Sequence, residues 1–194
     1  MLYEKTETTS KISAYMYDMG GGGTYGATTG TAGEDQFGYT KPASSVNDNF
    51  DQFLGVFAAN HLNNYLFRKK FKSLQYVIVN TEPLNGKEGH WISLSRYKDK
   101  KGRIILEFFD SLSWPVILLH HNIKKTIQNA YFDIFVTNNK ILQHPRSKFC
   151  AFYTIARFMS LIKKTNMLDF LSYFTHVLSK NDELVLRYIR MISK

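Results

Sequence analysis

Residues 90–110 read HWISLSRYKDKKGRIILEFFD, and this stretch decides the fold. Two apolar runs, Trp91 to Tyr97 and Arg103 to Asp110, flank the polar sequence Asp-Lys-Lys-Gly at 99–102. Apolar runs of this length bounded by turn residues are typical of β-strands, and a short polar connection between them predicts a hairpin. Because the second run is nearly all apolar, we expect it to be a central strand.

The hairpin makes a prediction for its two polar ends. If the loop consists of the three residues 99–101, residues whose numbers sum to 200 face each other, and His90 lies opposite Asp110. Facing Cβ atoms are about 4.5–5.5 Å apart, within reach of a hydrogen bond between an imidazole and a carboxylate. A loop with an even number of residues would put the two side chains on opposite faces. Glu107 is the rival carboxylate, but its odd offset from Asp110 predicts the other face.

Around the hairpin, the apolar periodicity predicts further strands and helices. The resulting order predicts an α+β fold in which helices pack on a small mixed or antiparallel sheet. No internal repeat is evident. The additional strands are expected at 74–81 and 131–137, and the helices at 115–130, from Ser147 onward, at 167–178 and at 182–192.

The first 48 residues differ in composition from the rest. Glycine, threonine and serine are frequent there and aliphatic residues are few. Such a segment cannot bury enough apolar surface to order itself. We therefore expect a flexible arm over 1–48 and one compact domain over 49–194, for which 44% hydrophobic residues supply the core.

The charge and the hydropathy pattern limit the partners. A formal net charge of +9 favours polyanions, so DNA bound through a basic surface is one expected partner, and a basic surface that merely keeps the chain soluble is the alternative. No zinc-finger spacing, RNA-binding signature or Walker loop accompanies the charge. No run approaches the roughly 18 apolar residues of a membrane span, and the chain does not start with a secretory signal. We expect neither membrane association nor export.

Cys150 is the only cysteine, which excludes an intrachain disulfide. A lone cysteine with histidines elsewhere is a candidate nucleophile, and a buried core thiol is the alternative. A helix that begins at Ser147 places Cys150 at about its third or fourth position. Unpaired N–H groups and the helix dipole favour negative charge there, and the backbone N–H of Cys150 can bind a developing oxyanion.

Hydrolysis by a thiol also needs a base, a group that orients the base, and oxyanion donors. The hairpin favours His90 as the base and Asp110 as the orienting group. Gln143 lies in a polar loop seven residues before Cys150, so its amide is a candidate second donor, and an ordinary solvated glutamine is the alternative. The six histidines that compete for the role of base are His61, His90, His120, His121, His144 and His176.

These blocks resemble a known family in their order and spacing. His90-Trp91, Phe109 to Leu112, Gln143 and Cys150 are similar to the His, acid, Gln and Cys blocks of adenain, the adenovirus protease, and of the SUMO-deconjugating proteases. With weaker likeness further upstream, the resemblance covers about residues 53–160. It implies a papain-like/adenain-like fold in which the four residues are catalytic and Gln143 and Cys150 form the oxyanion hole.

The resemblance has departures. Ala151 follows the cysteine where the family has Gly, and Asp110 stands where adenain has Glu. Adenain carries an activating peptide on a second cysteine, which this chain lacks, so no disulfide-linked peptide cofactor of that kind is expected. No metal or other cofactor is expected either. Trp91 and Trp114 are expected to line the substrate cleft.

The resemblance also implies a function. It indicates a cysteine endopeptidase that cuts after Gly-containing motifs and matures capsid or core precursors of a DNA virus, virophage or Maverick/Polinton-type element. The expected location is the cytoplasm or nucleus of the host cell and the virion. Met19 to Gly23 fits the cleavage motif, so self-cleavage is expected between Gly22 and Gly23, with the arm as a propeptide; a plain linker is the alternative.

Two other functions stay open. A deconjugase for ubiquitin or SUMO also cuts after Gly-Gly with the same chemical groups. A basic virion protein that binds DNA and has lost activity is the non-enzymatic alternative.

Overall fold

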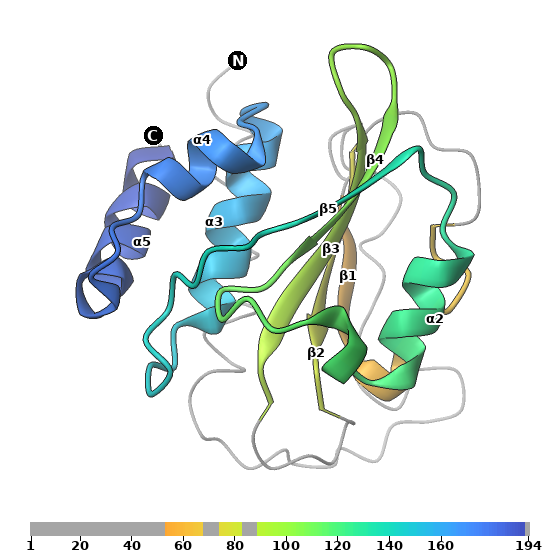
Figure 1. Ribbon diagram of the computed structural model, residues 1–194, viewed down its shortest axis with the longest axis horizontal. Coiled ribbons are helices and arrows are strands. Elements are labelled where there is room, and N and C mark those ends of the chain that lie inside the picture. The colour runs from red at the N-terminus through yellow and green to blue at the C-terminus, as the bar shows by residue number, and fades with distance from the viewer. Residues whose placement is uncertain (1–52, 68–73, 83–88, 193–194) are drawn as a thin grey trace, which may run out of the picture. The chain divides into compact units, whose positions relative to one another are not determined.

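The computed structural model describes residues 53–67, 74–82 and 89–192 (Figure 1). Five strands form one sheet in the order β1-β2-β3-β4-β5. The neighbours β1/β2 and β4/β5 are parallel, and β2/β3 and β3/β4 are antiparallel. The predicted α+β class with a small mixed sheet is therefore confirmed. The strands are β1 (Phe53–Ala58), β2 (Gln75–Asn80), β3 (Trp91–Lys98), β4 (Ile104–Phe109) and β5 (Ile134–Thr137).

Helices cover both faces of the sheet. In Figure 1, α2 lies on one side, and α3, α4 and α5 lie on the other. Within the described ranges, no helix is long and apolar enough to cross a membrane. The helices are α2 (His121–Asn129), α3 (Cys150–Ile162), α4 (Met167–Ser172) and α5 (Leu178–Ile192), with short 3₁₀ turns η2 (Ala59–His61) and η3 (Val116–Leu118).

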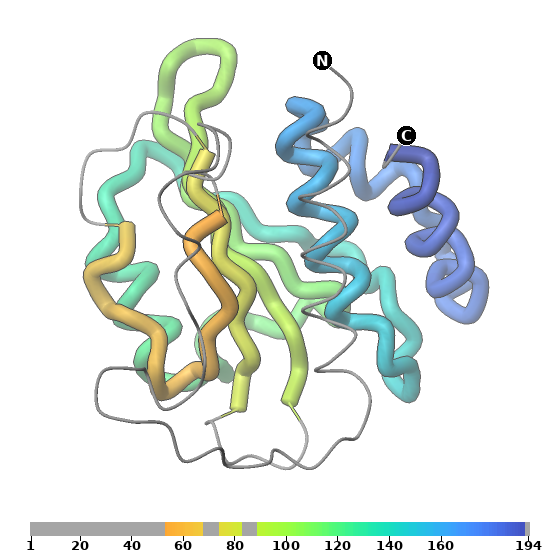
Figure 2. Tube along the Cα trace, turned by 180° about the vertical axis from the view of Figure 1, so that it is seen from behind, coloured from red at the N-terminus to blue at the C-terminus, as the bar shows by residue number. Residues whose placement is uncertain are grey.

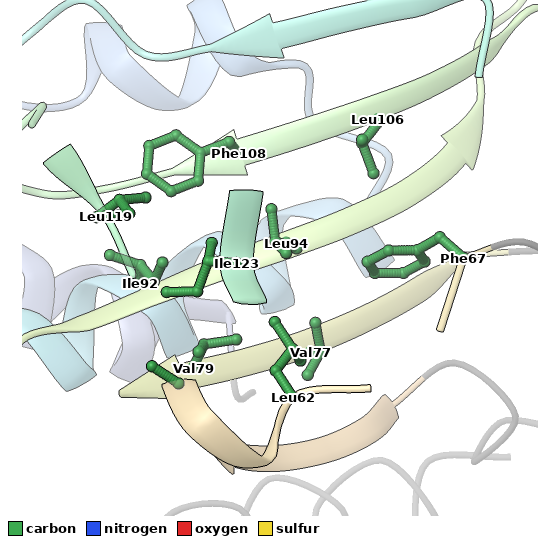
Figure 3. Packing of buried hydrophobic residues seen from close by; sticks show 11 residues of the cluster. Leu62, Phe67, Val77, Val79, Ile92, Leu94, Leu106, Phe108, Leu119 and Ile123 are labelled. Atoms are coloured by element: carbon green, nitrogen blue, oxygen red, sulfur yellow. The ribbon is translucent and has the colours of Figure 1, made fainter. Parts of the chain in front are cut away.

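Each face of the sheet has its own hydrophobic core. Figure 3 shows the core on the α2 side, where Ile123 lies among side chains of β2, β3 and β4. The core on the other side joins Phe109 of β4 to α3, α4 and α5. Along β4, Leu106 and Phe108 face α2, whereas Phe109 faces α3. Because both faces are buried, β2 and β4 are apolar along most of their length. The middle strand β3 instead buries the polar residues Ser93, Ser95 and Arg96.

The hairpin register differs from the predicted one. Leu94 pairs with Phe108, so facing residues sum to 202 rather than 200. The N–H of Asp99 donates to the carbonyl of Arg103, and the N–H of Arg103 donates to the Asp99 side chain. The loop is therefore 100–102, three residues as predicted but one position later. Gly102 adopts a φ of 78°, the left-handed position that a three-residue hairpin loop requires at its end. The glycine therefore fixes where the loop falls.

Two predicted helices have different bounds. The helix expected at 115–130 is split, because Leu119 and His120 are extended with ψ values of 163° and 143°, and His120 caps α2 by accepting from the N–H of Asn122. The helix expected from Ser147 begins at Cys150. Ser147 instead accepts a hydrogen bond from the N–H of Phe149 in the preceding turn.

Further differences concern β5, which is Ile134–Thr137 and not the expected 131–137, and the two ends of the domain. Strand β1 was not predicted, and its irregular pairing at Gly55, where φ is 131°, interrupts the alternation of a strand. The helices expected at 167–178 and 182–192 are Met167–Ser172 and Leu178–Ile192. The arm at 1–48, with Gly22 and Gly23, lies outside the described residues.

Candidate active site

Four separate segments bring the predicted site residues to one end of the sheet. His90 directly precedes β3, and Asp110 directly follows β4. Because β3 and β4 are antiparallel, the start of one strand lies beside the end of the other. Cys150 is the first residue of α3, and its side chain lies close enough to His90 to raise the pKa of the imidazole. Gln143 lies in the loop between β5 and α3.

The carboxylate of Asp110 orients the ring of His90. The Nε2 atom of His90 lies 2.5 Å from Oδ1 of Asp110, and Asp110 is fully buried. Oδ1 also accepts from the N–H of Leu112 at 2.7 Å, and Oδ2 accepts from the N–H of Trp114 at 3.1 Å. Since an ionised carboxylate can only accept, Nε2 carries a proton and Nδ1 is left for the sulfur of Cys150.

The predicted contact between His90 and Asp110 therefore forms, but with a different geometry. In the observed register Asp110 follows Phe109, whose partner is Ser93, so the two site residues meet diagonally and not directly opposite each other. The shift of the register by two positions preserves the face on which each side chain lies. For this reason an incorrect loop position still led to the correct pair.

Asn138 holds the backbone of Asp110, and sequence reasoning missed it. Its Oδ1 accepts from the N–H of Asp110 at 2.9 Å, and its Nδ2 donates to the carbonyl of Asp110 at 2.6 Å. Asn138 follows β5 directly and is only 3% exposed. The side-chain amide thus continues the β4/β5 ladder beyond its last pair, Phe108 with Thr137. The only sequence signal for this role is the position of Asn138 just after a strand, and the neighbouring Asn139 fits the same signal.

The backbone of His90 is fixed by its neighbours. Its N–H donates to Oγ1 of Thr81 at 3.2 Å, and its carbonyl accepts from the N–H of Thr81 at 2.8 Å. A Cβ atom at Gly89 would lie 1.8 Å from Oδ1 of Asn80. The absence of a side chain at Gly89 therefore leaves room for the amide of Asn80 beside the residue that precedes the histidine.

Trp114 supplies the aromatic contact with His90. The two ring centroids are 5.1 Å apart with the planes tilted by 49°, and the indole is 44% exposed. The indole therefore shields one face of the imidazole and presents its outer side to solvent. Trp91, the other tryptophan expected in a cleft, begins β3 opposite Asn80 and is half-buried.

Gln143 is a buried, anchored residue and not a solvated one, with only 2% of its surface exposed. Its Oε1 accepts from Oγ of Ser111 at 2.6 Å, and its Nε2 donates to the carbonyl of Ser147 at 2.7 Å. An amide nitrogen carries two hydrogens, so one remains for a ligand after the bond to Ser147. Ser111 lies in the quoted Phe109-to-Leu112 block, but sequence reasoning assigned it no role.

Cys150 lies two to three residues nearer the helix start than expected, which is less than one turn. It is the first residue of α3 and is 8% exposed. The first N–H groups of a helix have no acceptor within the helix, and they point toward whatever lies at its N-terminus. The backbone N–H of Cys150 is therefore available as a donor at the N-terminus of α3, and the second hydrogen of the Gln143 amide is available in the preceding loop.

The electrostatics of His90 reflect this environment. Burial is the largest single influence and lowers the pKa of His90, but hydrogen bonds to Asp110 and Cys150, together with their negative charge, outweigh it. The pKa rises from an ordinary 6.5 to about 9. The ring is thus protonated at neutral pH, an arrangement that suits an imidazolium next to a thiolate.

Other candidate groups are engaged elsewhere. Glu107, the rival carboxylate, binds Arg157 of α3 through both of its oxygens. His120 and His121 lie at the start of α2, with ring centroids 4.2 Å apart. Across residues 53–67, 74–82 and 89–192, no group of three His, Cys, Asp or Glu side chains is placed to hold a metal ion.

Comparison with known proteins finds only distant likeness. No protein-family model and no curated protein matches the chain. Among solved structures, an ASFV protease is similar with 15% identity and a TM-score of 0.42, over 60% of this chain and 43% of that one. The Legionella pneumophila effector RavZ is similar with 14% identity and a TM-score of 0.36, over 74% of this chain and 49% of that one.

A third similar structure is the central domain of an uncharacterized Legionella pneumophila protein, with 14% identity and a TM-score of 0.38, over 73% of this chain and 85% of that one. The chain spans less than half the length of the ASFV protease and of RavZ. At such scores the likeness carries no argument about activity. The functional proposal therefore depends on the geometry of the site.

Proposed function

We propose that the chain is a cysteine endopeptidase that cleaves after Gly-containing motifs. The observation that carries the proposal is the meeting of Cys150, His90 and Asp110 at one end of the sheet, with the buried amide of Gln143 anchored in the adjoining loop. Nucleophile, base, orienting carboxylate and oxyanion donor are the parts that thiol hydrolysis requires. The resemblance to adenain in the order and spacing of these residues supports the same proposal.

In the resting site the proton of the Cys150 thiol is on His90, so a thiolate lies beside an imidazolium. In the first half of the reaction this thiolate attacks the carbonyl carbon of the substrate. The carbonyl oxygen becomes an oxyanion, which the backbone N–H of Cys150 and the side-chain amide of Gln143 stabilise. His90, held by Asp110, then gives its proton to the leaving amine as the carbon–nitrogen bond breaks. The product is a thioester between the substrate and Cys150.

In the second half, water hydrolyses the thioester. His90 takes a proton from the water, hydroxide adds to the thioester carbonyl, and the same donors hold the second oxyanion. Collapse of the tetrahedral intermediate releases the carboxylic acid and restores the pair of thiolate and imidazolium. Trp114 covers His90 and is proposed, with Trp91, to line the substrate cleft.

The substrates and the location are proposed on the resemblance alone. They are capsid or core precursors of a DNA virus, virophage or Maverick/Polinton-type element, processed in the host cytoplasm or nucleus and in the virion. The net charge of +9 supports DNA as a further partner. The Met19-to-Gly23 motif of the arm supports self-cleavage between Gly22 and Gly23.

A peptide with the sequence of residues 15–27 tests the function. We expect the purified protein to cut it between the positions of Gly22 and Gly23, as read by mass spectrometry, and to leave SUMO and ubiquitin fusions intact. The same cut in the protein itself would appear as a mass difference between the wild type and a Cys150→Ala variant. Cleavage of the fusions alone would assign the chain to the deconjugases, and turnover of neither substrate would contradict the proposal.

The pH dependence follows from the raised pKa of His90. Because the folded pKa of about 9 exceeds the ordinary 6.5, the protonated ring stabilises the fold fully below pH 6.5, and this contribution is lost as the pH rises through 9. The leaving amine also needs that proton, so we expect kcat/KM to fall over the same range.

An NMR titration of the His90 ring measures this directly. We expect a midpoint near 9 in the wild type and a lower one in Asp110→Asn, which removes the charge of the carboxylate that contributes to the rise. Cys150→Ala should lower the midpoint as well. A wild-type midpoint near 6.5, unchanged in both variants, would contradict the assignment of the pair.

A further inference from the structure

We propose that Asn181, at the start of α5, is a positioning residue for the oxyanion donor Gln143, and that the α4–α5 helix pair thereby belongs to the catalytic machinery. The inference rests on the proposed function, in which Gln143 stabilises the oxyanion. Figures 1 and 2 both show the segment between β5 and α3 beside the C-terminal helices. The peptide group between Leu142 and Gln143 accepts hydrogen bonds from Asn181 and, at the longer distance of 3.4 Å, from the hydroxyl of Tyr153, and it donates one to Ser111.

Asn181 is a buried amide whose hydrogen bonds are all directed. It is fully buried, and its Nδ2 donates to the carbonyl of Leu142 at 2.8 Å and to that of Thr175 at 3.0 Å. Its Oδ1 accepts from the N–H and the hydroxyl of Thr175 at 3.0 and 3.1 Å. Both N–H groups and the oxygen are thus used, so the side chain can hold its partners in only one orientation.

The bond to Leu142 acts on the peptide group that joins Leu142 to Gln143. The carbonyl of Leu142 accepts from Asn181, and the N–H of Gln143, on the other side of the same planar group, donates to the carbonyl of Ser111 at 3.1 Å. A planar peptide held at both its oxygen and its nitrogen cannot rotate about its neighbouring bonds. The direction in which the Gln143 side chain leaves the backbone is therefore fixed from α5 on one side and from Ser111 on the other.

Lys140 provides a second tether for the same loop. Its Nζ donates to the carbonyls of Leu171 and Phe174, at 3.1 and 2.5 Å, at the C-terminal end of α4. A cation at a helix C-terminus is favoured by the helix dipole as well as by these bonds. The loop that carries Gln143 is thus attached at two points. Lys140 binds the end of α4, and the carbonyl of Leu142, directly before Gln143, binds Asn181 of α5.

A purely structural role for Asn181 predicts different behaviour from a positioning role. The loss of a positioning residue reduces the stabilisation of the oxyanion, whereas alkylation of Cys150 by iodoacetamide forms no oxyanion and depends only on the thiolate and His90. Val185→Ala is the matched control, since Val185 is a fully buried residue of α5 one turn further on.

The kinetic test uses Asn181→Ala with the peptide of residues 15–27. We expect kcat to fall about 10- to 100-fold with KM nearly unchanged, as for a catalytic group displaced by about 1 Å. The alkylation rate should stay at the wild-type value, and Asn181→Ala should cause no further loss in a Gln143→Ala background. An equal loss in that background, parallel loss of alkylation, or the same loss in Val185→Ala would overturn the inference.

A second readout is independent of turnover. The side-chain NH₂ of Gln143 can be followed by ¹⁵N NMR, and we expect its protection from hydrogen exchange to fall in Asn181→Ala but not in Val185→Ala. Unchanged protection overturns the inference even in an active enzyme, whereas reduced protection in a protein that cuts no peptide overturns only the proposed function. If Asn181→Ala does not fold, Lys140→Met removes the second tether and is expected to act in the same direction.

Discussion

Cys150→Ala is expected to abolish peptide cleavage, with kcat lower by about 10⁴- to 10⁶-fold, the range typical for loss of a catalytic nucleophile. The reason is that the sulfur lies at the first position of α3 against His90, and no other cysteine exists in the chain to replace it. The measurement is single-turnover cleavage of the peptide of residues 15–27. The control is Lys125→Ala, which should retain full activity because Lys125 is an exposed residue of α2, on the opposite face of the sheet from α3.

The same experiment tests whether Cys150 and His90 act as a unit. His90→Ala alone should lose nearly as much activity as Cys150→Ala, and the double variant should be no worse than either single change, because residues of one catalytic unit are strongly non-additive. His90→Ala should also slow alkylation of Cys150 at neutral pH. A Cys150→Ala protein that cuts the peptide within tenfold of the wild-type rate would refute the assignment of the nucleophile.

The hairpin shows why part of the site was predictable from sequence. The contact between His90 and Asp110 was predicted on the condition of an odd loop, and any three-residue loop keeps the two side chains on the same face whether it begins at 99 or at 100. The exact register depends on the left-handed φ of Gly102, which the sequence allows but does not require. The prediction was therefore correct for the face of the sheet on which His90 and Asp110 lie, and wrong for which residues of β3 and β4 pair directly.

The parts that were not predicted depend on contacts between distant segments. Asn138 and Ser111 are short polar residues after strands, and nothing in a single sequence says that one binds the backbone of Asp110 and the other the amide of Gln143. Apolar periodicity gives the buried face of α3 but not its first residue, because the turn held by Ser147 precedes the helix. Local pattern thus predicted the elements, and tertiary hydrogen bonds decided the details of the site.

The buried ion pair between Glu107 and Arg157 joins α3, which begins at Cys150, to β4, the strand that leads to Asp110. Arg157 is fully buried and Glu107 is 1% exposed, and their two bonds measure 2.7 and 2.6 Å. Glu107 also accepts from the hydroxyl of Tyr97, and Arg157 donates to Oγ of Ser160. Every charged atom of the pair has a partner, which is the condition under which a buried pair is tolerated.

Glu107→Ala is expected to lower the free energy of unfolding by about 3–5 kcal/mol, because it leaves the guanidinium of Arg157 buried without its counter-charge. Urea unfolding with a common m-value measures this change. Glu183→Ala, which breaks the exposed pair with Arg187 on α5, is the matched control and should change little, since solvent screens such pairs.

The double variant Glu107→Leu/Arg157→Met distinguishes the free-energy cost of losing the ion pair from the cost of leaving one buried charge without a partner. Replacing both partners by apolar residues of similar length should recover most of the stability lost in Glu107→Ala, because no buried charge is left unpaired. A cost for Glu107→Ala no larger than that for Glu183→Ala would show that water reaches the guanidinium. Helix α3 carries Cys150 at its first residue and Arg157 two turns later, so the ion pair lies on the same helix as the cysteine. A stable double variant that still cuts the peptide would show that hydrophobic packing alone can hold Cys150 against His90.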